Sequence, residues 1–211
     1  MCTLLPATKC QVPSVASVLT LGSYLEKLHY TSPHGISALR GVRWGLSRAR
    51  EIAGEIAEDK AAVRALVREL FGEDVEVRKR AADVARRITE RDGRLLERYA
   101  DELAGLLETM PVEESRTRWH LGLVVPRVAH TRAQRLRAAR TMSLLAQDES
   151  NVVRCSAVEG MGLLAMQEAS LRDELEEMVE SFLREGTLAM KSRARGVNRR
   201  LEKASKARRE I

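Results

Sequence analysis

The chain reads Val77-Arg78-Lys79-Arg80-Ala81 at the start of one helical segment, and this pattern returns three more times. Each copy has a cation followed three residues later by a small or apolar side chain, with further apolar residues at helical spacing. The other copies are Thr117-Arg118-Trp119-His120-Leu121, Val153-Arg154-Cys155-Ser156-Ala157 and Met190-Lys191-Ser192-Arg193-Ala194. The cations are 40, 36 and 37 residues apart. A period in this range indicates stacked helical hairpins.

Turn-forming residues separate the apolar segments on both sides of each copy. They are Gly72, Asp92-Gly93, Pro111, Asp148 and Gly186. First helices are predicted at 59–70, 94–108, 132–146 and 169–184. Second helices are predicted at 75–90, 115–129, 150–165 and 188–207. The repeats then cover about 59–90, 94–129, 132–165 and 169–207.

The composition supports helices over strands. Aromatic residues make up 3% of the 211 residues, and strands are enriched in aromatic and β-branched side chains. A chain of this length has room for about four to five hairpins. The predicted fold class is therefore all-α, an α-α superhelix in the form of a right-handed solenoid.

The recurring V-R-x-x-A pattern resembles the HEAT repeat family, including its bilin-lyase-type relatives. The resemblance covers about residues 59–207. It implies that an acidic residue just before each second helix pairs with the recurring cation. The pairs implied are Glu73 with Arg78, Glu113 with Arg118 and Asp148 with Arg154. The fourth hairpin offers no clear counterpart, and the Trp, Leu-Gly and Tyr signature of tetratricopeptide repeats is absent.

The N-terminal part lies outside the repeat pattern. Residues 1–35 contain Pro6, Pro13, Pro33 and Gly22 with scattered Ser and Thr, so an irregular segment is predicted there. Residues 36–57 have a one-sided helical pattern and are predicted to cap the stack. The repeat domain as a whole is then 36–211.

The net charge of +6 is distributed in bands. Residues 115–147 carry seven arginines and no carboxylate. Residues 148–185 carry ten acidic and three basic residues, and 186–211 carry nine basic and two acidic residues. Bands of opposite sign in neighbouring hairpins are expected to neutralise each other over distances of about 8 Å.

The second helices are expected to line the concave side of a solenoid. Leu121, Val125 and Val128 define a buried face, which places Trp119 on an exposed stripe flanked by arginines. An exposed Trp beside Arg is typical of an interface hot spot, although packing of Trp119 against the next hairpin is an equal alternative. The candidate partner-binding residues are Arg80, Arg87, Arg116, Trp119, His120, Leu123, Arg127, Glu159, Arg193 and Arg200.

No catalytic, cofactor-binding or metal-binding residues are expected. The nucleotide-binding, zinc-protease and serine-hydrolase motifs are absent, and neither the four His nor the three Cys have ligand spacing. We therefore expect a protein that is not an enzyme. No segment is apolar enough to cross a membrane, and the early apolar stretch makes a poor signal peptide. A cytoplasmic location is expected, and the oligomeric state is left open.

Three functions remain open at this point. The first is a protein-binding scaffold or adaptor using the concave surface. The second is DNA binding, since some HEAT-like solenoids resemble alkylation-repair glycosylases; phosphate contacts would come from Arg80, Arg87, Arg116, Arg127 and Arg193. The third is a bilin-lyase-like protein, by analogy of fold alone. A continuous positive groove would favour nucleic acid, whereas a mixed groove centred on Trp119 would favour protein.

Overall fold

The computed structural model describes residues 34–41 and 44–209. The chain divides into two units, residues 1–31 and 32–211. The first unit, and with it Cys2, Cys10 and nearly all of the predicted irregular segment, lies outside the described residues. Every regular element in the described part is a helix, which confirms the all-α prediction.

The helices α4 to α11 form four antiparallel pairs close to the predicted boundaries. Their bounds are α4 (Lys60–Leu70), α5 (Val75–Arg91), α6 (Ala100–Thr109), α7 (Ser115–Val128), α8 (Arg132–Leu145), α9 (Asn151–Gln167), α10 (Arg172–Glu185) and α11 (Leu188–Arg209). Two of the first helices begin with 3-10 turns, η2 (Gly93–Tyr99) before α6 and η4 (Ala169–Leu171) before α10. A third turn, η3 (Val112–Glu114), precedes α7.

The prediction of a single helix over residues 36–57 is wrong. The chain instead forms α2 (His34–Ser37), the 3-10 turn η1 (Ala38–Arg40) and α3 (Leu46–Ala57). The first helical stretch ends at Gly41, which adopts an extended conformation with φ −67° and ψ 156°. α3 packs against α5, as a further second helix would.

Side-chain caps explain where several helices begin. The Asp59 carboxylate accepts a hydrogen bond from the Ala61 N–H at the start of α4. Asp74 accepts from the Glu76 and Val77 N–H groups at the start of α5. Thr131 and Gln134 form a reciprocal capping box at the start of α8. Each cap satisfies N–H groups that have no partner within the helix.

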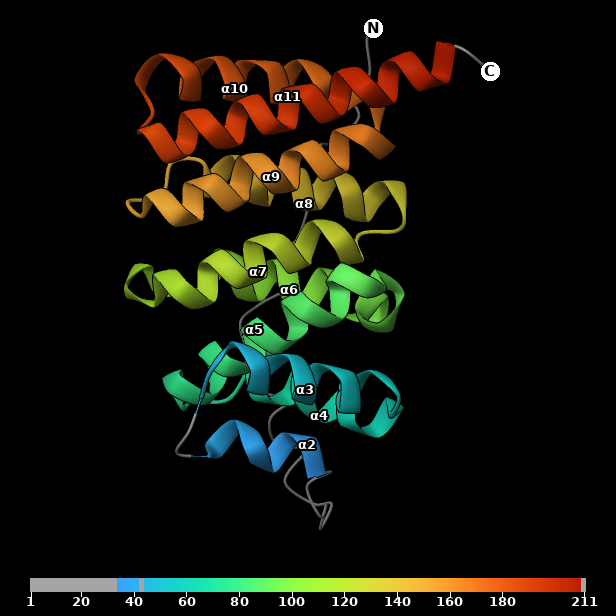
Figure 1. Cartoon of the computed structure of the whole chain (residues 1–211), viewed down its shortest axis with the longest axis vertical. Helices are drawn as coiled ribbons and strands as arrows, with labels where there is room; N and C mark the ends of the chain where they lie inside the picture. The colour runs from blue at the N-terminus through green and yellow to red at the C-terminus, as the bar shows by residue number, and fades with distance from the viewer. Residues whose placement is uncertain (1–33, 42–43, 210–211) are drawn as a thin grey trace, which may run out of the picture. The chain divides into compact units, whose positions relative to one another are not determined.

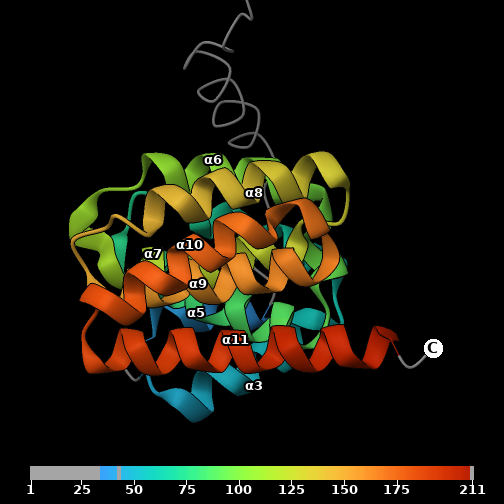
Figure 2. The same cartoon turned by 90° about the horizontal axis from the view of Figure 1, so that it is seen from above.

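The helices are arranged in two layers; Figure 1 shows the stack from the side and Figure 2 shows it from above. In one layer α3, α5, α7, α9 and α11 pack against each other in that order, and α6 packs against α8 in the other. Between the layers lies a continuous apolar core that includes Leu66, Ile88, Leu103, Leu121 and Met161. The packing is consistent with an α-α superhelix.

Glycines bring the second helices close together. A Cβ atom at Gly160 in α9 would lie 2.6 Å from Pro126 Cγ and 3.0 Å from the Gly122 carbonyl oxygen, both in α7. A Cβ atom at Gly162 would lie 2.6 Å from Val197 Cγ1 in α11. Because only a glycine fits at these contacts, α7, α9 and α11 form a closely spaced row, and their outward side chains share one surface.

Candidate partner-binding surface

The first three recurring cations, Arg78, Arg118 and Arg154, make structural contacts, and the first of them links two hairpins. Arg78 at the start of α5 donates from Nε to Glu114 Oε2 over 2.9 Å and from Nη2 to Glu114 Oε1 over 2.5 Å. It also donates to the carbonyl oxygen of Gly72, after the end of α4. The hydrogen bond to Glu114, opposed by burial, raises the pKa of Arg78. Arg78 therefore links its own hairpin to the next one through an ion pair.

Arg118 repeats this arrangement one hairpin further on. Its Nε and Nη2 donate to Asp148 Oδ2 over 3.0 and 2.5 Å, and its Nη1 donates to the carbonyl oxygen of Met110 over 2.7 Å. Both side chains are buried. The expected pairs Glu73 with Arg78 and Glu113 with Arg118 are therefore wrong, because each guanidinium reaches the carboxylate of the following hairpin.

Arg154 takes the same place in the third hairpin, but none of the described carboxylates pairs with it. Its Nε donates to the Ala146 carbonyl oxygen over 3.1 Å, and its guanidinium carbon lies 5.4 Å from the centre of the Phe182 ring. The expected pair of Asp148 with Arg154 is also wrong, since Asp148 is taken by Arg118. The three arginines thus share a carbonyl contact with the end of their own first helix, a favourable place for a cation.

The second-helix face is the side of α5, α7, α9 and α11 turned away from the first helices. Its members by helical spacing are Lys79, Asp83, Arg86, Arg87, Glu90, Arg116, Trp119, Leu123, Arg127, Cys155, Glu159, Leu163, Arg193 and Arg200. Most of the candidate residues from the sequence lie on it. The exceptions are His120 and Arg80.

On α5, the carboxylate Asp83 is buried between two arginines. Arg87 Nε donates to Asp83 Oδ1 over 3.1 Å, and Arg86 Nη2 donates to the same oxygen over 3.3 Å. The side chain of Arg87 is only 11% exposed. Arg87 is therefore engaged within α5 and is poorly placed to contact a phosphate group.

A second set of charges crosses the face from α5 to α11. Arg127 Nη2 lies 3.9 Å from Glu90 Oε1, and burial lowers the pKa of Arg127. In α9, Glu159 accepts from Arg200 over 2.6 Å and from Arg193 over 3.2 Å. The structure thus brings Glu159, Arg193 and Arg200 together as one cluster, with the two arginines half-exposed.

Trp119 and His120 lie between these charge clusters, but only Trp119 reaches the surface. The rings are stacked with centroids 4.3 Å apart, and Trp119 is half-buried. His120 is 6% exposed, so the prediction that it lies on an exposed stripe is wrong. Burial, together with Arg86, Arg116 and Arg87 and against the opposing effect of Asp83, lowers the pKa of His120 to about 4. His120 is therefore neutral at neutral pH.

Arg80 is part-buried and contacts the N-terminal part of the unit. Its Nη1 donates to the carbonyl oxygens of Leu39 and Gly41 over 2.9 and 2.7 Å. The guanidinium carbon lies 5.3 Å from the centre of the Trp44 ring. The prediction of Arg80 as a partner-binding residue does not fit this geometry, because its side chain holds η1 and Trp44 against α5.

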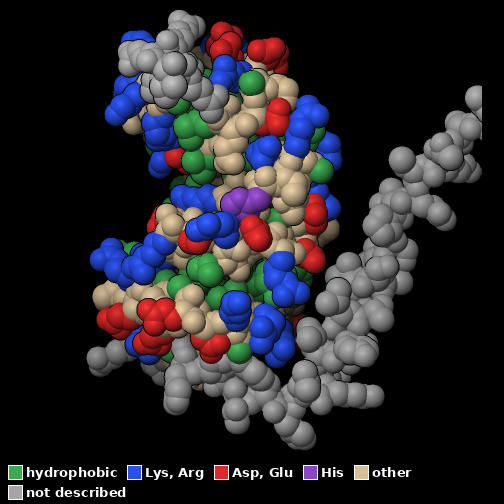
Figure 3. Space-filling model, turned by 90° about the vertical axis from the view of Figure 1, so that its right-hand side faces the viewer, with side chains coloured by type: hydrophobic (Ala, Val, Ile, Leu, Met, Phe, Trp, Pro, Cys, Tyr) green, Lys and Arg blue, Asp and Glu red, His purple; other side chains and the backbone are tan. Residues whose placement is uncertain are grey.

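The second-helix face carries mixed charge. Among its described cations only the exposed Arg116 lacks a carboxylate within 4.0 Å, since Lys79 pairs with Glu76 and the arginines pair with Asp83, Glu90 and Glu159. The right-hand side of the unit is mixed as well: Figure 3 shows Lys and Arg side chains interspersed with carboxylates and apolar side chains. Trp119 and Leu123, both half-buried, form the apolar centre of the face.

Sequence reasoning missed a second surface, the hairpin-turn edge, formed by the turns between first and second helices. The large apolar side chains that are exposed in the described part all lie at or beside these turns: Leu46, Phe71, Val75, Val112, Leu144, Val152 and Leu188. Figure 1 shows the turns of the last three hairpins along its left-hand side. The spacing of Val75, Val112, Val152 and Leu188, which is 37, 40 and 36 residues, is the sequence signal that could have revealed them.

Few of the described residues are arranged for metal binding or catalysis. No group of three or more His, Cys, Asp or Glu side chains among them is arranged to hold a metal ion. Cys155 is a free thiol whose pKa is raised by burial, so the reactive thiolate form is disfavoured. No helix in the described part is long and apolar enough to cross a membrane.

Comparisons with known proteins add no family. The chain matches no protein-family model, no curated protein and no solved structure.

Proposed function

We propose that the chain is a HEAT-like α-solenoid that serves as a protein-binding scaffold, with the partner held on the second-helix face. The observation that carries the proposal is the mixed charge of this face around Trp119 and Leu123. Interfaces between proteins favour a partly buried aromatic side chain at the centre and paired or exposed charges around it. We also propose a cytoplasmic location, because the three cysteines have neither the number nor the spacing of a disulfide framework, which is typical of a reducing compartment.

The mixed charge of the second-helix face supports DNA binding less well than it supports protein binding. Phosphate contacts need free cations, and the affinity they give falls steeply as the salt concentration rises. Arg87 and Arg127 have carboxylate partners, and Arg80 is bonded to backbone carbonyl groups. Binding of a duplex would have to break these contacts. A duplex-binding assay at about 50 mM salt, where phosphate contacts are strong, tests this alternative.

The scaffold proposal is tested by affinity capture with the full chain and two double variants. Trp119→Ala with Arg127→Ala alters the centre of the second-helix face. Val152→Glu with Leu188→Glu alters the hairpin-turn edge while leaving that face intact. Circular dichroism and thermal unfolding establish that both variants are folded. We expect the first variant to lose the specific partner and the second to retain it.

The remaining outcomes discriminate between the surfaces. Loss of the partner only in the Val152→Glu, Leu188→Glu variant would move the binding site to the hairpin-turn edge. An unchanged set of captured proteins in both variants would contradict the scaffold proposal for these two surfaces. Duplex binding with a steep salt dependence, lost on Arg116→Ala, would favour nucleic acid instead.

A further inference from the structure

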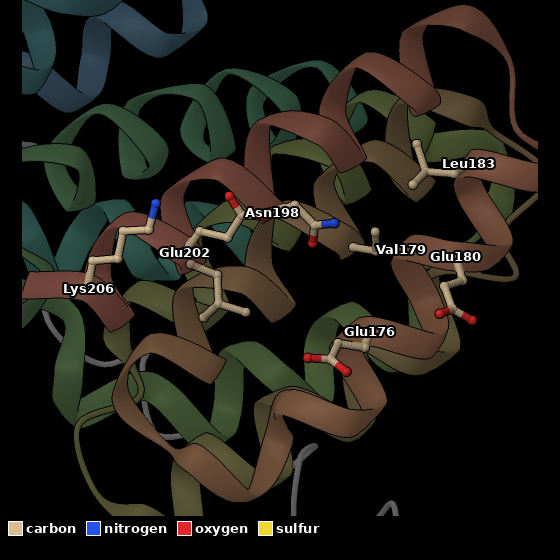
Figure 4. A pocket seen from close by; sticks show the side chains of 8 residues that line it. Glu176, Val179, Glu180, Leu183, Asn198, Glu202 and Lys206 are labelled. Carbon is tan, nitrogen blue, oxygen red and sulfur yellow. The ribbon is translucent and has the colours of Figure 1, made fainter. Parts of the chain in front are cut away.

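The last hairpin has an outer side that no described helix covers. A cleft of about 580 Å³ opens there between α10 and α11. Its apolar lining residues are Val179, Leu183 and Leu201, and its polar ones are Glu176, Glu180, Asn198, Glu202 and Lys206. Figure 4 shows Val179 of α10 and Asn198 of α11 approaching each other across it. The end face is defined by these residues together with Lys191 and Arg195 on the same side of α11.

The two helices of the end face carry side chains of opposite charge, and in the described part these do not pair with each other. α10 presents the exposed carboxylates of Glu176 and Glu180, whereas α11 presents Lys191, Arg195 and Lys206 against the single carboxylate of Glu202. Among the described side chains no ion pair joins α10 to α11; the arginines of α11 that are paired, Arg193 and Arg200, pair with Glu159 of α9. The expected neutralisation between the acidic band at 148–185 and the basic band at 186–211 is therefore incomplete at this face.

We propose that the end face is a self-association surface and that its occupant is a second copy of this chain. The charge pattern fits a two-fold axis lying between α10 and α11 and parallel to them. Such an axis places the acidic α10 of each copy over the basic α11 of the other, and both contacts are favourable at once. An axis perpendicular to the helices would place α10 on α10, with like charges opposed.

The shape of the end face is compatible with this arrangement. α10 has 14 residues and is about 21 Å long, and two packed helices are roughly 20 Å wide. α11 has 22 residues and extends beyond α10, as Figure 2 shows, so it offers additional contact to a partner copy. A face of this size lies at the small end of specific interfaces, which predicts a dimer with a Kd in the micromolar range.

Sedimentation velocity of the full chain, at about 1 to 200 μM, measures the association. The wild type is expected to shift from monomer towards dimer over this range and to associate less at high salt. Leu201→Glu places a charge in the apolar lining of the cleft and is expected to weaken association at least tenfold. Far-ultraviolet circular dichroism establishes that this variant retains its helices.

Charge reversal gives the sharper experiment. Glu176→Lys with Glu180→Lys makes both helices of the end face basic, whereas Lys191→Glu with Arg195→Glu makes both acidic. Each variant alone is expected to be monomeric throughout the concentration range. An equimolar mixture is expected to form a heterodimer, because the opposed faces are then complementary. A single chain carrying all four substitutions is expected to form homodimers again.

Two control variants establish that association depends on the end face itself. Glu51→Lys with Glu55→Lys makes the same change in net charge as Glu176→Lys with Glu180→Lys, but at exposed positions of α3. This variant is expected to leave the dimer unchanged. Trp119→Ala with Arg127→Ala is also expected to dimerise as the wild type does, so failure of the scaffold proposal is distinguishable from failure of the dimer proposal. A wild type that is monomeric at every concentration, or charge variants that do not associate when mixed, would overturn the dimer proposal.

Discussion

Arg118 Nη2 lies 2.5 Å from Asp148 Oδ2, and this contact joins the start of α7 to the turn that precedes α9 in the next hairpin. Arg118→Met leaves the buried carboxylate of Asp148 without a counterion. Removal of one partner of a buried ion pair costs about 3–5 kcal/mol. We expect urea unfolding to show a loss of this size in the free energy of unfolding.

A double-mutant cycle measures the coupling energy between Arg118 and Asp148 separately from the contacts that each residue makes with its surroundings. Asp148→Asn is the suitable second substitution, because Asp148 Oδ1 also accepts from the Ser150 N–H over 2.8 Å and Asn retains that turn contact. The double variant is expected to be less destabilised than the sum of the single variants. Arg48→Ala removes an exposed pair with Glu51 and should change stability by less than about 1 kcal/mol. Additive effects of the two buried substitutions would contradict the coupling.

Gly160→Ala tests the close packing of α7 and α9. The new Cβ would lie 2.6 Å from both Met142 Sδ and Pro126 Cγ, so the two helices must separate. We expect a loss of about 1–3 kcal/mol in unfolding free energy, despite the better helix propensity of Ala. The matched control is Gly54→Ala in α3, where nothing lies within 4 Å of the new atom. That variant should be stabilised by about 0.5–1 kcal/mol.

The buried His120 predicts a pH dependence of stability. Its pKa is about 4 in the folded protein and about 6.5 in an unfolded chain, so the unfolded state binds the proton more readily. The contribution of the neutral imidazole is complete above about pH 6.5 and is lost as the pH falls towards 4. At pH 5 the loss should be about 2 kcal/mol relative to pH 7.

His120→Gln removes the titrating group and serves as the reference for this measurement. Denaturant unfolding at several pH values should show a steeper decline for the wild type than for the variant between pH 6.5 and 5. Parallel declines of the two proteins would mean that His120 does not carry the effect. Titration of His120 by NMR near pH 6.5 in the folded protein would contradict its assigned environment directly.

Arg80→Ala is expected to loosen the segment from Ile36 to Trp44 without unfolding the repeats. The substitution removes two hydrogen bonds from a charged donor to backbone carbonyl oxygens, each of a kind worth about 1.5–3 kcal/mol. Amide hydrogen exchange should therefore rise by about tenfold or more in that segment alone. Lys79→Ala, which removes the ion pair with Glu76, should leave exchange unchanged.

Helix positions were predictable from the sequence because they depend on local signals. The apolar period and the turn residues place α5 at 75–91 against a prediction of 75–90, and α9 at 151–167 against 150–165. The break at Gly41 was missed, since the apolar pattern continues through it. The pattern records which side of a segment is buried, not whether the chain bends between two buried parts.

The partners of the charged residues were not predictable in the same way. Glu113 is near Arg118 in sequence, but the guanidinium extends across the stack to Asp148. His120 looked exposed because the helical wheel of α7 takes no account of α5, whose Asp83, Arg86 and Arg87 lie beside it. Contacts between hairpins depend on their offset and spacing, and no signal within one helix encodes these quantities.

The links made by Arg78 and Arg118 bear on how such a chain can grow. The hairpin of α6 and α7 receives the guanidinium of Arg78 from the hairpin before it and offers that of Arg118 to the hairpin after it. If the gene segment encoding this hairpin were duplicated in place, the one new junction would bring Arg118 of the first copy to Glu114 of the second, so a donor and an acceptor would already be present. Lengthening the array would need no new kind of charged residue, whereas deleting half a hairpin would leave a buried charge without its partner.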